Sequence, residues 1–476
     1  MEMNEKKITL TKGQERAIKE LKKFFYSDTA KIFIIKGYAG TGKTTLIKEI
    51  INWLGTMEAI AVLLASTGRA SKILSNITEY PTKTIHGEIY RFNDFNQDLE
   101  SIAETRELQK IDKTGQLYLT FGLCKVDRTN KKEYFYIIDE SSMIGEKQEK
   151  DVKQALFGSG QLLVDLLQYD PYGKFIFVGD VCQLPPINET FSPALSANHF
   201  RWRYAVEAHE IELTEIVRQK KDNDIIGVSQ KIRALYASPP QTEWAKFPLR
   251  GRKNIKIFPS QVSMLSDYVQ RMKRNGYNNT TLICRSNKNC NTLTSLIRPS
   301  LGLTQTTLQK GDLLLVTQNN YISGLMNGDL VEVIDVGIRH RRAQLTFLHV
   351  EVKELNTQKV YSQLLIEDIL YHGKINLTQE QQKELFVDYY YRMKEKEIKQ
   401  SSETFRNAMW TDMYLNALRT VYGFALTCHK AQGGEWDHVY LDLSRMYSTP
   451  ASYQWLYTAI TRAKIQLYVA ENPCLI

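Results

Sequence analysis

Cysteine is scarce in this sequence, and its spacing excludes a structural zinc site. The 476 residues include six cysteines, which form no C-x-x-C pair and do not lie near a histidine at the spacing of zinc ligands. We interpret them as reduced, partly buried thiols of a cytoplasmic protein.

Long apolar runs are also absent. No stretch reaches the roughly 18 apolar residues that a membrane-spanning helix requires, and residues 1–12 are polar and charged, unlike the apolar core of a signal peptide. Hydrophobic residues still make up 43% of the chain and charged residues 24%, which is typical of a globular protein with a sizeable core. We therefore expect a cytoplasmic protein of roughly two to four structural units with no membrane partner.

The charge balance is basic. Lys and Arg total 62 and Asp and Glu total 53, which gives a formal net charge of +9. Lys and Arg neutralise phosphates and release condensed counterions, so a basic excess favours a polyanionic partner. Many basic proteins bind no nucleic acid, however, and the charge alone leaves both alternatives open.

Short apolar segments alternate with helical patterns along the chain. Continuous β-branched and aromatic runs of this length are typical of central strands in a parallel sheet that is buried on both faces. The alternation predicts an α/β, doubly wound architecture. The predicted strands are residues 31–35, 59–65, 134–138, 174–178 and 281–284, and helical patterns include residues 13–25 and 44–54.

Two stretches interrupt this alternation. Residues 88–132 are polar, mixed in charge and rich in turn residues, and we interpret them as a subdomain inserted into a first lobe. Residues 330–334 and 343–352 again have the pattern of strands, and charged helical sequence follows at 379–399. This second stretch predicts a small β-barrel with a helical arm.

A phosphate-binding loop follows the first predicted strand. Residues 37–44 read Gly-Tyr-Ala-Gly-Thr-Gly-Lys-Thr and match G-x-x-x-x-G-K-[ST] in the required position between a strand and a helix. Glycines let backbone N–H groups point at phosphate oxygens, and the positive end of the helix favours the same anion. We expect Lys43 to reach the β- and γ-phosphates and Thr44 to bind Mg²⁺. The predicted nucleotide-binding residues of this loop are Gly37, Ala39, Gly40, Thr41, Gly42, Lys43, Thr44 and Thr45.

An acidic pair follows the third predicted strand. Asp139 and Glu140 come directly after the apolar residues 136–138, at the carboxyl edge of the sheet where the P-loop also lies. We expect Asp139 to hold Mg²⁺ through water and Glu140 to polarise the attacking water as a general base. P-loop and acidic pair together predict a nucleoside-triphosphate hydrolase.

Further motifs follow in a fixed order. They occupy residues 10–14, 64–71, 84–86, 179–186, 213–219, 282–287, 425–435 and 456–463. With the P-loop and the acidic pair, this series resembles superfamily 1 helicases of the RecD-like, Dda-like and Pif1-like branch, and the resemblance covers almost the full chain. Residues 158–163 lack the signature expected of Pif1 enzymes, which favours a Dda-like or RecD-like relative.

The resemblance implies an α/β fold of two RecA-like P-loop lobes, in which parallel sheets are flanked by helices. We expect residues 1–87 and 133–200 to form the first lobe, and residues 201–335 and 420–476 the second. Residues 88–132 would then be a strand-splitting insertion, with Phe92, Phe95, Tyr118 and Phe121 as candidate wedges or local core. Residues 336–419 would be an SH3-like β-barrel insertion with a helical arm.

The resemblance also assigns roles to single residues. Gln14 would bond the adenine edge, Gln183 would sense the γ-phosphate, and Glu435 would face the ribose. Arg218 and Arg462 would stabilise charge on the transferred phosphoryl group, with Arg462 as the arginine finger. The residues implied in DNA binding are Thr67, Arg69, Thr84, His86, Asn287, Thr427 and His429.

The implied activity is ATP-dependent unwinding of duplex DNA by 5′-to-3′ movement along a single strand. ATP and Mg²⁺ would be the cofactors, and single-stranded and forked duplex DNA the partners of a monomer, with replication or repair proteins as further candidates. Three alternatives stay open: an NTP switch or clamp loader without unwinding, a non-catalytic nucleic-acid-binding subunit, and an ATPase subunit of a larger recombination complex.

Overall fold

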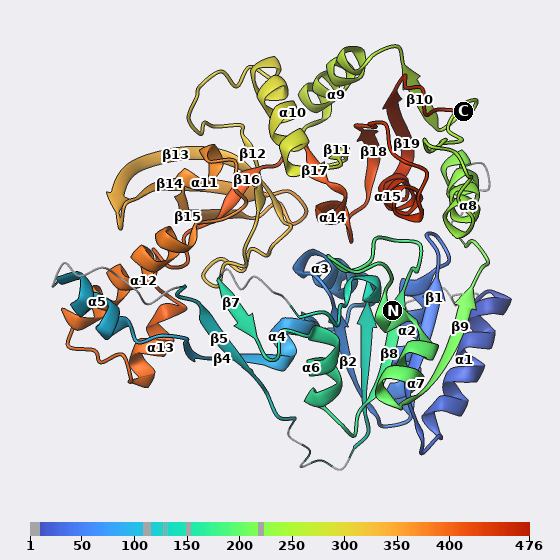
Figure 1. Ribbon diagram of the computed structural model, residues 1–476, viewed down its shortest axis with the longest axis horizontal. Coiled ribbons are helices and arrows are strands. Elements are labelled where there is room, and N and C mark those ends of the chain that lie inside the picture. Colours follow the sequence, from blue (N-terminus) through green and yellow to red (C-terminus); the bar gives the residue numbers. More distant parts are fainter. Residues whose placement is uncertain are drawn as a thin grey trace, which may run out of the picture.

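Two lobes lie one above the other, and a third region extends to one side of both (Figure 1). The computed structural model describes residues 10–107, 116–126, 128, 130, 132–148, 154–217 and 223–476. Each lobe is built on a parallel sheet, whereas the side region contains antiparallel strands. This architecture confirms the predicted α/β fold with two lobes and inserted units.

The first lobe holds a six-stranded parallel sheet in the order β3-β2-β6-β8-β1-β9. Its strands are β1 (Ala30–Gly37), β2 (Ile60–Ala65), β3 (Thr82–Thr84), β6 (Tyr134–Asp139), β8 (Lys174–Gly179) and β9 (Glu207–Leu213). The central strands β1, β6 and β8 each contain a continuous buried apolar run because both faces of the sheet are covered, and their polar residues lie at or next to the strand ends. The four strands predicted for this lobe are thereby confirmed.

Helices cover the two faces of this sheet. Alternate strand residues point to opposite faces, so Phe33 and Ile137 pack in one core and Ile34 and Ile138 in the other. The first face is covered by α1 (Lys12–Phe25), α2 (Lys43–Thr56) and α3 (Gly68–Thr78). The second is covered by α4 (Ile85–Ile89), α6 (Leu162–Tyr169) and α7 (Ala197–Tyr204), with two 3-10 turns at Ser141–Met143 and Pro193–Leu195.

The second lobe holds a five-stranded parallel sheet in the order β10-β19-β18-β11-β17. Its strands are β10 (Ile255–Phe258), β11 (Thr280–Cys284), β17 (Leu426–Thr427), β18 (Trp436–Leu441) and β19 (Ala463–Ala470). Its helices are α8 (Asp224–Ala237), α9 (Gln261–Asn275), α10 (Asn287–Ser300), α14 (Cys428–Ala431) and α15 (Pro450–Ile460). Helix α15 lies on the side of this lobe that faces the first one (Figure 1).

The later insertion is a five-stranded sheet in the order β15-β14-β13-β12-β16, with antiparallel neighbours. Its strands are β12 (Leu313–Val316), β13 (Leu330–Arg342), β14 (Leu345–Glu354), β15 (Val360–Ile366) and β16 (Thr420–Tyr422). The helical arm consists of α11 (Asp368–Tyr371), α12 (Gln379–Lys394) and α13 (Glu403–Met409). The strand-rich sequence and its helical arm are thus confirmed, whereas closure into an SH3-like barrel stays a prediction.

The earlier insertion packs against this helical arm. It contains β4 (Tyr90–Phe95), α5 (Leu99–Glu107) and β5 (Leu119–Leu123), and β7 (Ala155–Phe157) pairs with β5. Phe95 lies edge-on to Phe386 of α12, with 5.0 Å between ring centroids, and Leu99 and Ile102 of α5 are buried in the same cluster as Tyr390. The two insertions therefore share one hydrophobic core.

Three expected domain boundaries need correction. The first lobe does not end at 200, because β9 pairs in parallel with β1, and its alternating exposed and buried residues mark an edge strand without a continuous apolar run. The first insertion extends beyond 132, since β7 completes its sheet. The second insertion is wider than 336–419, because β12 and β16 belong to its sheet. Across the described residues, no helix combines the length and apolarity that a bilayer span requires.

Phe386→Ala tests the shared core. Phe386 is 3% exposed, and truncating a buried phenylalanine leaves a cavity that lowers the free energy of unfolding by about 3–5 kcal/mol. We expect hydrogen exchange of the backbone amides of both α12 and α5 to accelerate. Val360→Ala, at a side chain that is 55% exposed, serves as the control. Faster exchange confined to α12 would contradict a core common to both insertions.

Candidate nucleotide site and strand path at the lobe interface

The P-loop forms the turn between β1 and α2. Gly40 and Gly42 adopt φ angles of 81° and 77°, in the left-handed region that favours glycine. At Gly37 an added Cβ would lie 2.8 Å from Thr41 Oγ1 and 2.9 Å from Lys43 Cγ, so a side chain there would displace both. The sequence motif therefore reflects backbone constraints that only glycine meets.

Two predicted nucleotide ligands brace this loop. Lys43 Nζ donates hydrogen bonds to the carbonyl oxygens of Gly37, at 2.8 Å, and Tyr38, at 3.3 Å. Gln14 Nε2 donates to the carbonyl oxygens of Thr41 and Gly42 at 3.3 and 3.2 Å. Gln14 also belongs to the capping box at the start of α1, so its amide supports the P-loop directly, and the adenine contact stays a prediction.

The acidic pair and Gln183 lie beside the P-loop, because β6 and β8 end at the same edge of the sheet as β1. Glu140 has a φ of 52°, a left-handed conformation that a non-glycine residue adopts at a cost in energy. Glu140 Oε2, Ser142 Oγ and Gln183 Oε1 are buried and have no hydrogen-bond partner among the described residues. Three unpaired buried oxygens at one edge fit a hydrated cation and phosphate, whose waters would satisfy them.

Asp139 has an unusual protonation equilibrium. Burial raises its pKa to about 7, the negative charge of Glu140 adds to the rise, and Lys43 opposes it. The backbone N–H of Glu140 donates to Asp139 Oδ1 at 2.9 Å. A carboxyl group so disposed gains from a nearby divalent cation, since the cation favours its charged form.

The second lobe reaches this site through α15. Tyr457 Oη donates to Asp180 Oδ2 at 2.6 Å and accepts the backbone N–H of Ala39 in the P-loop at 3.1 Å. Tyr457 was not singled out from the sequence, because a tyrosine inside an apolar helix is more often a core residue. Its place within residues 456–463 was the available signal.

Of the two arginines predicted to act on the γ-phosphate, the structure describes Arg462. Arg462 is 4% exposed, and its hydrogen bonds go to Thr458, Gly434 and Thr461 within the second lobe. Arg218 lies outside the described residues. The preceding residue, Val217, donates its N–H to the carbonyl of Gly40 at 2.9 Å, which brings this segment onto the P-loop.

Thr44, Thr45 and Glu435 complete the predicted nucleotide set. Thr44 and Thr45 lie in the first turn of α2, half-buried. Glu435 is exposed and precedes β18 in the second lobe. Roles for all three in binding stay predictions.

The predicted DNA contacts of the first lobe are only partly exposed. Thr67 and Thr84 cap α3 and α4 by accepting backbone N–H groups. Arg69 is 6% exposed, its guanidinium lies 4.4 Å from the ring centroid of Trp436, and burial lowers its pKa to about 10. Burial also lowers the pKa of His86 to about 4, so this ring is neutral at pH 7. Arg69 therefore faces the second lobe here, contrary to an open DNA-binding position.

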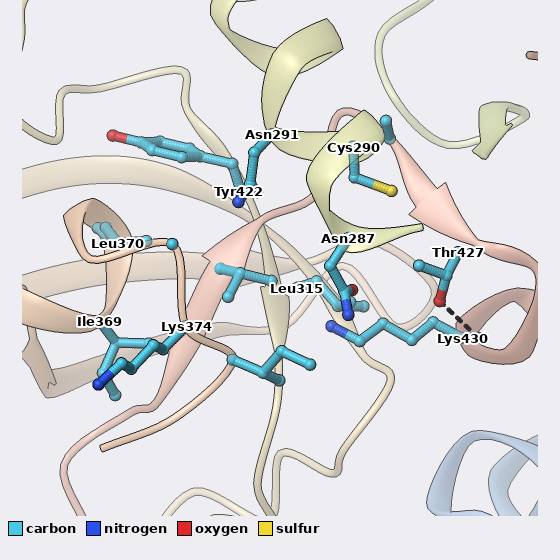
Figure 2. Close-up of a pocket in the computed structure, with 14 residues that line it drawn as sticks. Asn287, Cys290, Asn291, Leu315, Ile369, Leu370, Lys374, Tyr422, Thr427 and Lys430 are labelled. Atoms are coloured by element: carbon cyan, nitrogen blue, oxygen red, sulfur yellow. Dashed lines mark hydrogen bonds between the residues drawn. The ribbon is translucent and has the colours of Figure 1, made fainter. Parts of the chain in front are cut away.

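Two of the three DNA-binding residues predicted in the second lobe lie close together. Asn287 and Thr427 line one small pocket with Lys430 and Lys374, and Figure 2 shows the Lys430 side chain extending toward Asn287. His429 is exposed on α14. The Lys374 amine points away from Lys430 and Asn287 in the same view, so Lys430 and Asn287 are the pair placed to contact a phosphodiester backbone. Sequence reasoning missed both lysines, although Lys430 follows His429 directly; Lys374 lies in the insertion, outside any motif.

Three of the four candidate wedge aromatics, Phe92, Phe95 and Phe121, are linked by ring contacts. Phe92 lies 5.8 Å from Phe121 and 5.5 Å from Trp410 between ring centroids. Phe95 is 8% exposed in the shared core, and Tyr118 is half-buried beside it. The rings of Phe92, Phe95 and Phe121 therefore pack in the hydrophobic clusters, and a wedge role for any of the four stays a prediction.

Two family models match this chain, one mainly in the first lobe and one in the second. A model of the AAA domain matches residues 9–238, and a model of the UvrD-like helicase C-terminal domain matches residues 422–470. The chain is 23% identical to the ATP-dependent DNA helicase dda of Enterobacteria phage T4, over 96% of this chain and 98% of that protein. It is also 23% identical to an uncharacterised protein of Methanocaldococcus jannaschii, but spans 36% of that protein's length.

The fold is shared with a solved helicase structure. A structure of two coordinating Pif1 helicases, described as the basis for DNA unwinding at forked dsDNA, superposes with a TM-score of 0.50. The match covers 97% of this chain and 92% of that one at 15% identity. At 15% sequence identity, this superposition shows that the two proteins share a fold.

The raised pKa of Asp139 predicts a pH-dependent metal affinity. Below about pH 7 the carboxyl holds a proton that competes with the cation, so Mg²⁺ affinity in the presence of ADP should fall by up to about tenfold per pH unit. Calorimetric Mg²⁺ titrations at pH 6 and pH 8 measure the difference. Asp139→Asn, which cannot titrate, should bind weakly at both pH values. Equal Mg²⁺ affinity of the unsubstituted protein at both values would contradict the assignment.

Proposed function

We propose that this chain, which belongs to the Pif1-like and Dda-like group of superfamily 1B helicases, is an ATP-dependent DNA helicase that moves 5′-to-3′ along single-stranded DNA. The proposal rests mainly on one hydrogen bond between the lobes, which the backbone N–H of Ala39 in the P-loop donates to Tyr457 Oη of the second lobe. A phosphate site contacted by both lobes can convert nucleotide turnover into relative motion of the lobes. A single-lobe NTP switch would not require that contact.

The proposed chemistry is shared among residues of the first lobe. Lys43 binds the β- and γ-phosphates, Glu140 orients and deprotonates the attacking water, and Gln183 contacts the γ-phosphate. Thr44 and Asp139 would hold Mg²⁺, which supplies positive charge to the phosphate oxygens when bound. The unpaired oxygens of Glu140 and Gln183 support this arrangement.

We propose two arginines at the boundary between the lobes as the positive charges that act on the γ-phosphate. Arg462 lies on the second lobe, close enough to Asp180 to influence its charge, and would turn toward the γ-phosphate as the lobes close. Arg218 would join it from the segment after Val217. Both would stabilise charge on the transferred phosphoryl group, and their withdrawal after hydrolysis would let the lobes separate.

The proposed strand path crosses the lobes near α3 and the pocket of Asn287 and Thr427. Phosphate contacts carry most of the affinity for single strands and are indifferent to base sequence. The phage T4 relative is named as a DNA helicase and aligns along nearly its full length, which supports DNA as the substrate. We propose single-stranded and forked duplex DNA as the partners of a monomer.

Steady-state ATP hydrolysis with and without single-stranded DNA tests the function. We expect strong stimulation by DNA, and unwinding of forked duplexes that carry a 5′ tail but not of those with a 3′ tail. Lys43→Ala should abolish turnover without altering the fold, because the ammonium that binds the phosphates is lost. Hydrolysis that ignores DNA, without unwinding, would leave a nucleotide switch as the better account.

Arg462→Ala tests the arginine finger. An arginine that acts on the transferred phosphoryl group contributes to the transition state more than to the ground state, so turnover should fall by about 10³-fold while ATP affinity changes little. Arg445→Ala, which removes an exposed arginine of the same lobe stacked on Trp244, is the matched control. Equal losses in turnover and affinity would argue for a purely structural role.

A further inference from the structure

One buried hydroxyl joins three elements that meet at the lobe interface. Tyr457 is fully buried on α15, and its Oη donates to the carboxylate of Asp180 while it accepts the N–H of Ala39. Asp180 follows β8 of the first lobe and is also fully buried. One atom of the second lobe thus contacts both the P-loop and the end of a neighbouring strand.

Asp180 shapes the loop that carries Gln183. Its Oδ1 accepts the N–H of Cys182 at 2.9 Å, and its backbone carbonyl accepts the N–H of Gln183 at 3.1 Å. Burial raises the pKa of Asp180, whereas Lys43 and the hydrogen bond from Tyr457 oppose the rise. Removing the tyrosine hydroxyl would therefore leave a buried carboxylate with one fewer donor.

The same loop is fastened to the second lobe on its other side. Gln454 Nε2 donates to the carbonyl of Gln183 at 2.9 Å, and Thr458 Oγ1 accepts the N–H of Leu184 at 3.0 Å. Gln454, Tyr457 and Thr458 lie within about one turn of α15. A shift of α15 would therefore move the loop that carries Gln183 relative to the P-loop. The hydrogen bond between Ala39 and Tyr457 links the P-loop to the same helix.

We propose that Tyr457 is a positioning residue that transmits the position of the second lobe to the nucleotide site, a role that rests on the function proposed above. With the lobes together, its hydroxyl fixes the distance between Ala39 and Asp180, and hence between the P-loop and Gln183. With the lobes apart, this restraint is released. Tyr457 thereby makes turnover depend on how the lobes are held by DNA.

Tyr457→Phe, with Tyr453→Phe as the matched control, tests this role. Tyr453 is equally buried one turn earlier on α15, but its hydroxyl contacts Lys246 and Ser448 of its own lobe. ATP turnover is measured across a titration of oligothymidine, and ATP is then titrated at saturating DNA. We expect Y457F to lower the DNA-stimulated kcat about tenfold with KM for ATP within about twofold. Y453F should keep both values.

The possible results distinguish a positioning role of Tyr457 from a packing role, and both from a failure of the proposed helicase function. Equal changes in kcat and KM, or equal effects of Y453F, would reduce Tyr457 to a packing residue. Unstimulated turnover in the unsubstituted protein would remove the helicase itself, whereas normal stimulation in Y457F would overturn the inference alone. In a double-mutant cycle with Asp180→Asn, non-additive losses in kcat are expected if the two side chains act as a unit, and additive losses would contradict it.

Discussion

Several peptide groups of the P-loop form hydrogen bonds with segments that lie far from the loop in the sequence. The carbonyl of Thr41 accepts from Gln14 of α1, and that of Gly40 accepts the N–H of Val217. The carbonyl of Gly42 accepts from Gln14 in addition to the N–H of Leu46 in α2. The N–H of Ala39 is met from the second lobe. Unpaired peptide groups in a buried turn are costly, so this requirement orients α1, the segment after β9 and α15 around one loop.

The interface between the lobes combines apolar and polar contacts. Tyr38 of the P-loop, Cys182 and Leu184 pack against the hydrophobic core of the second lobe. Arg69 stacks on Trp436, and Gln432 Nε2 donates to the carbonyl of Leu184. Lys72 of α3 also forms an ion pair with the buried Asp329 that precedes β13. These hydrogen bonds and ion pairs can exchange for water at a small net cost. Separation of the lobes would therefore be opposed mainly by exposure of the apolar side chains between them.

Sequence reasoning recovered what is encoded locally. Buried strands such as β1 and β6 show continuous apolar runs, and the P-loop glycines are fixed by backbone geometry, so both were predictable. The edge strand β9 alternates polar and apolar residues and was assigned to the wrong lobe. The burial of Arg69 and the reach of Tyr457 depend on contacts between distant segments. No local pattern records which face of a lobe meets its neighbour.

The shared core of the insertions has a mechanical consequence. One insertion leaves the first lobe and the other leaves the second, yet Phe95 and Phe386 pack in a single cluster. The lobes are thus connected through this cluster as well as through the contacts at their own interface. Each insertion is continuous with one lobe, so a movement of one lobe relative to the other must leave this cluster intact or expose its apolar side chains to water. The cluster therefore opposes those relative movements of the lobes that would separate Phe95 from Phe386.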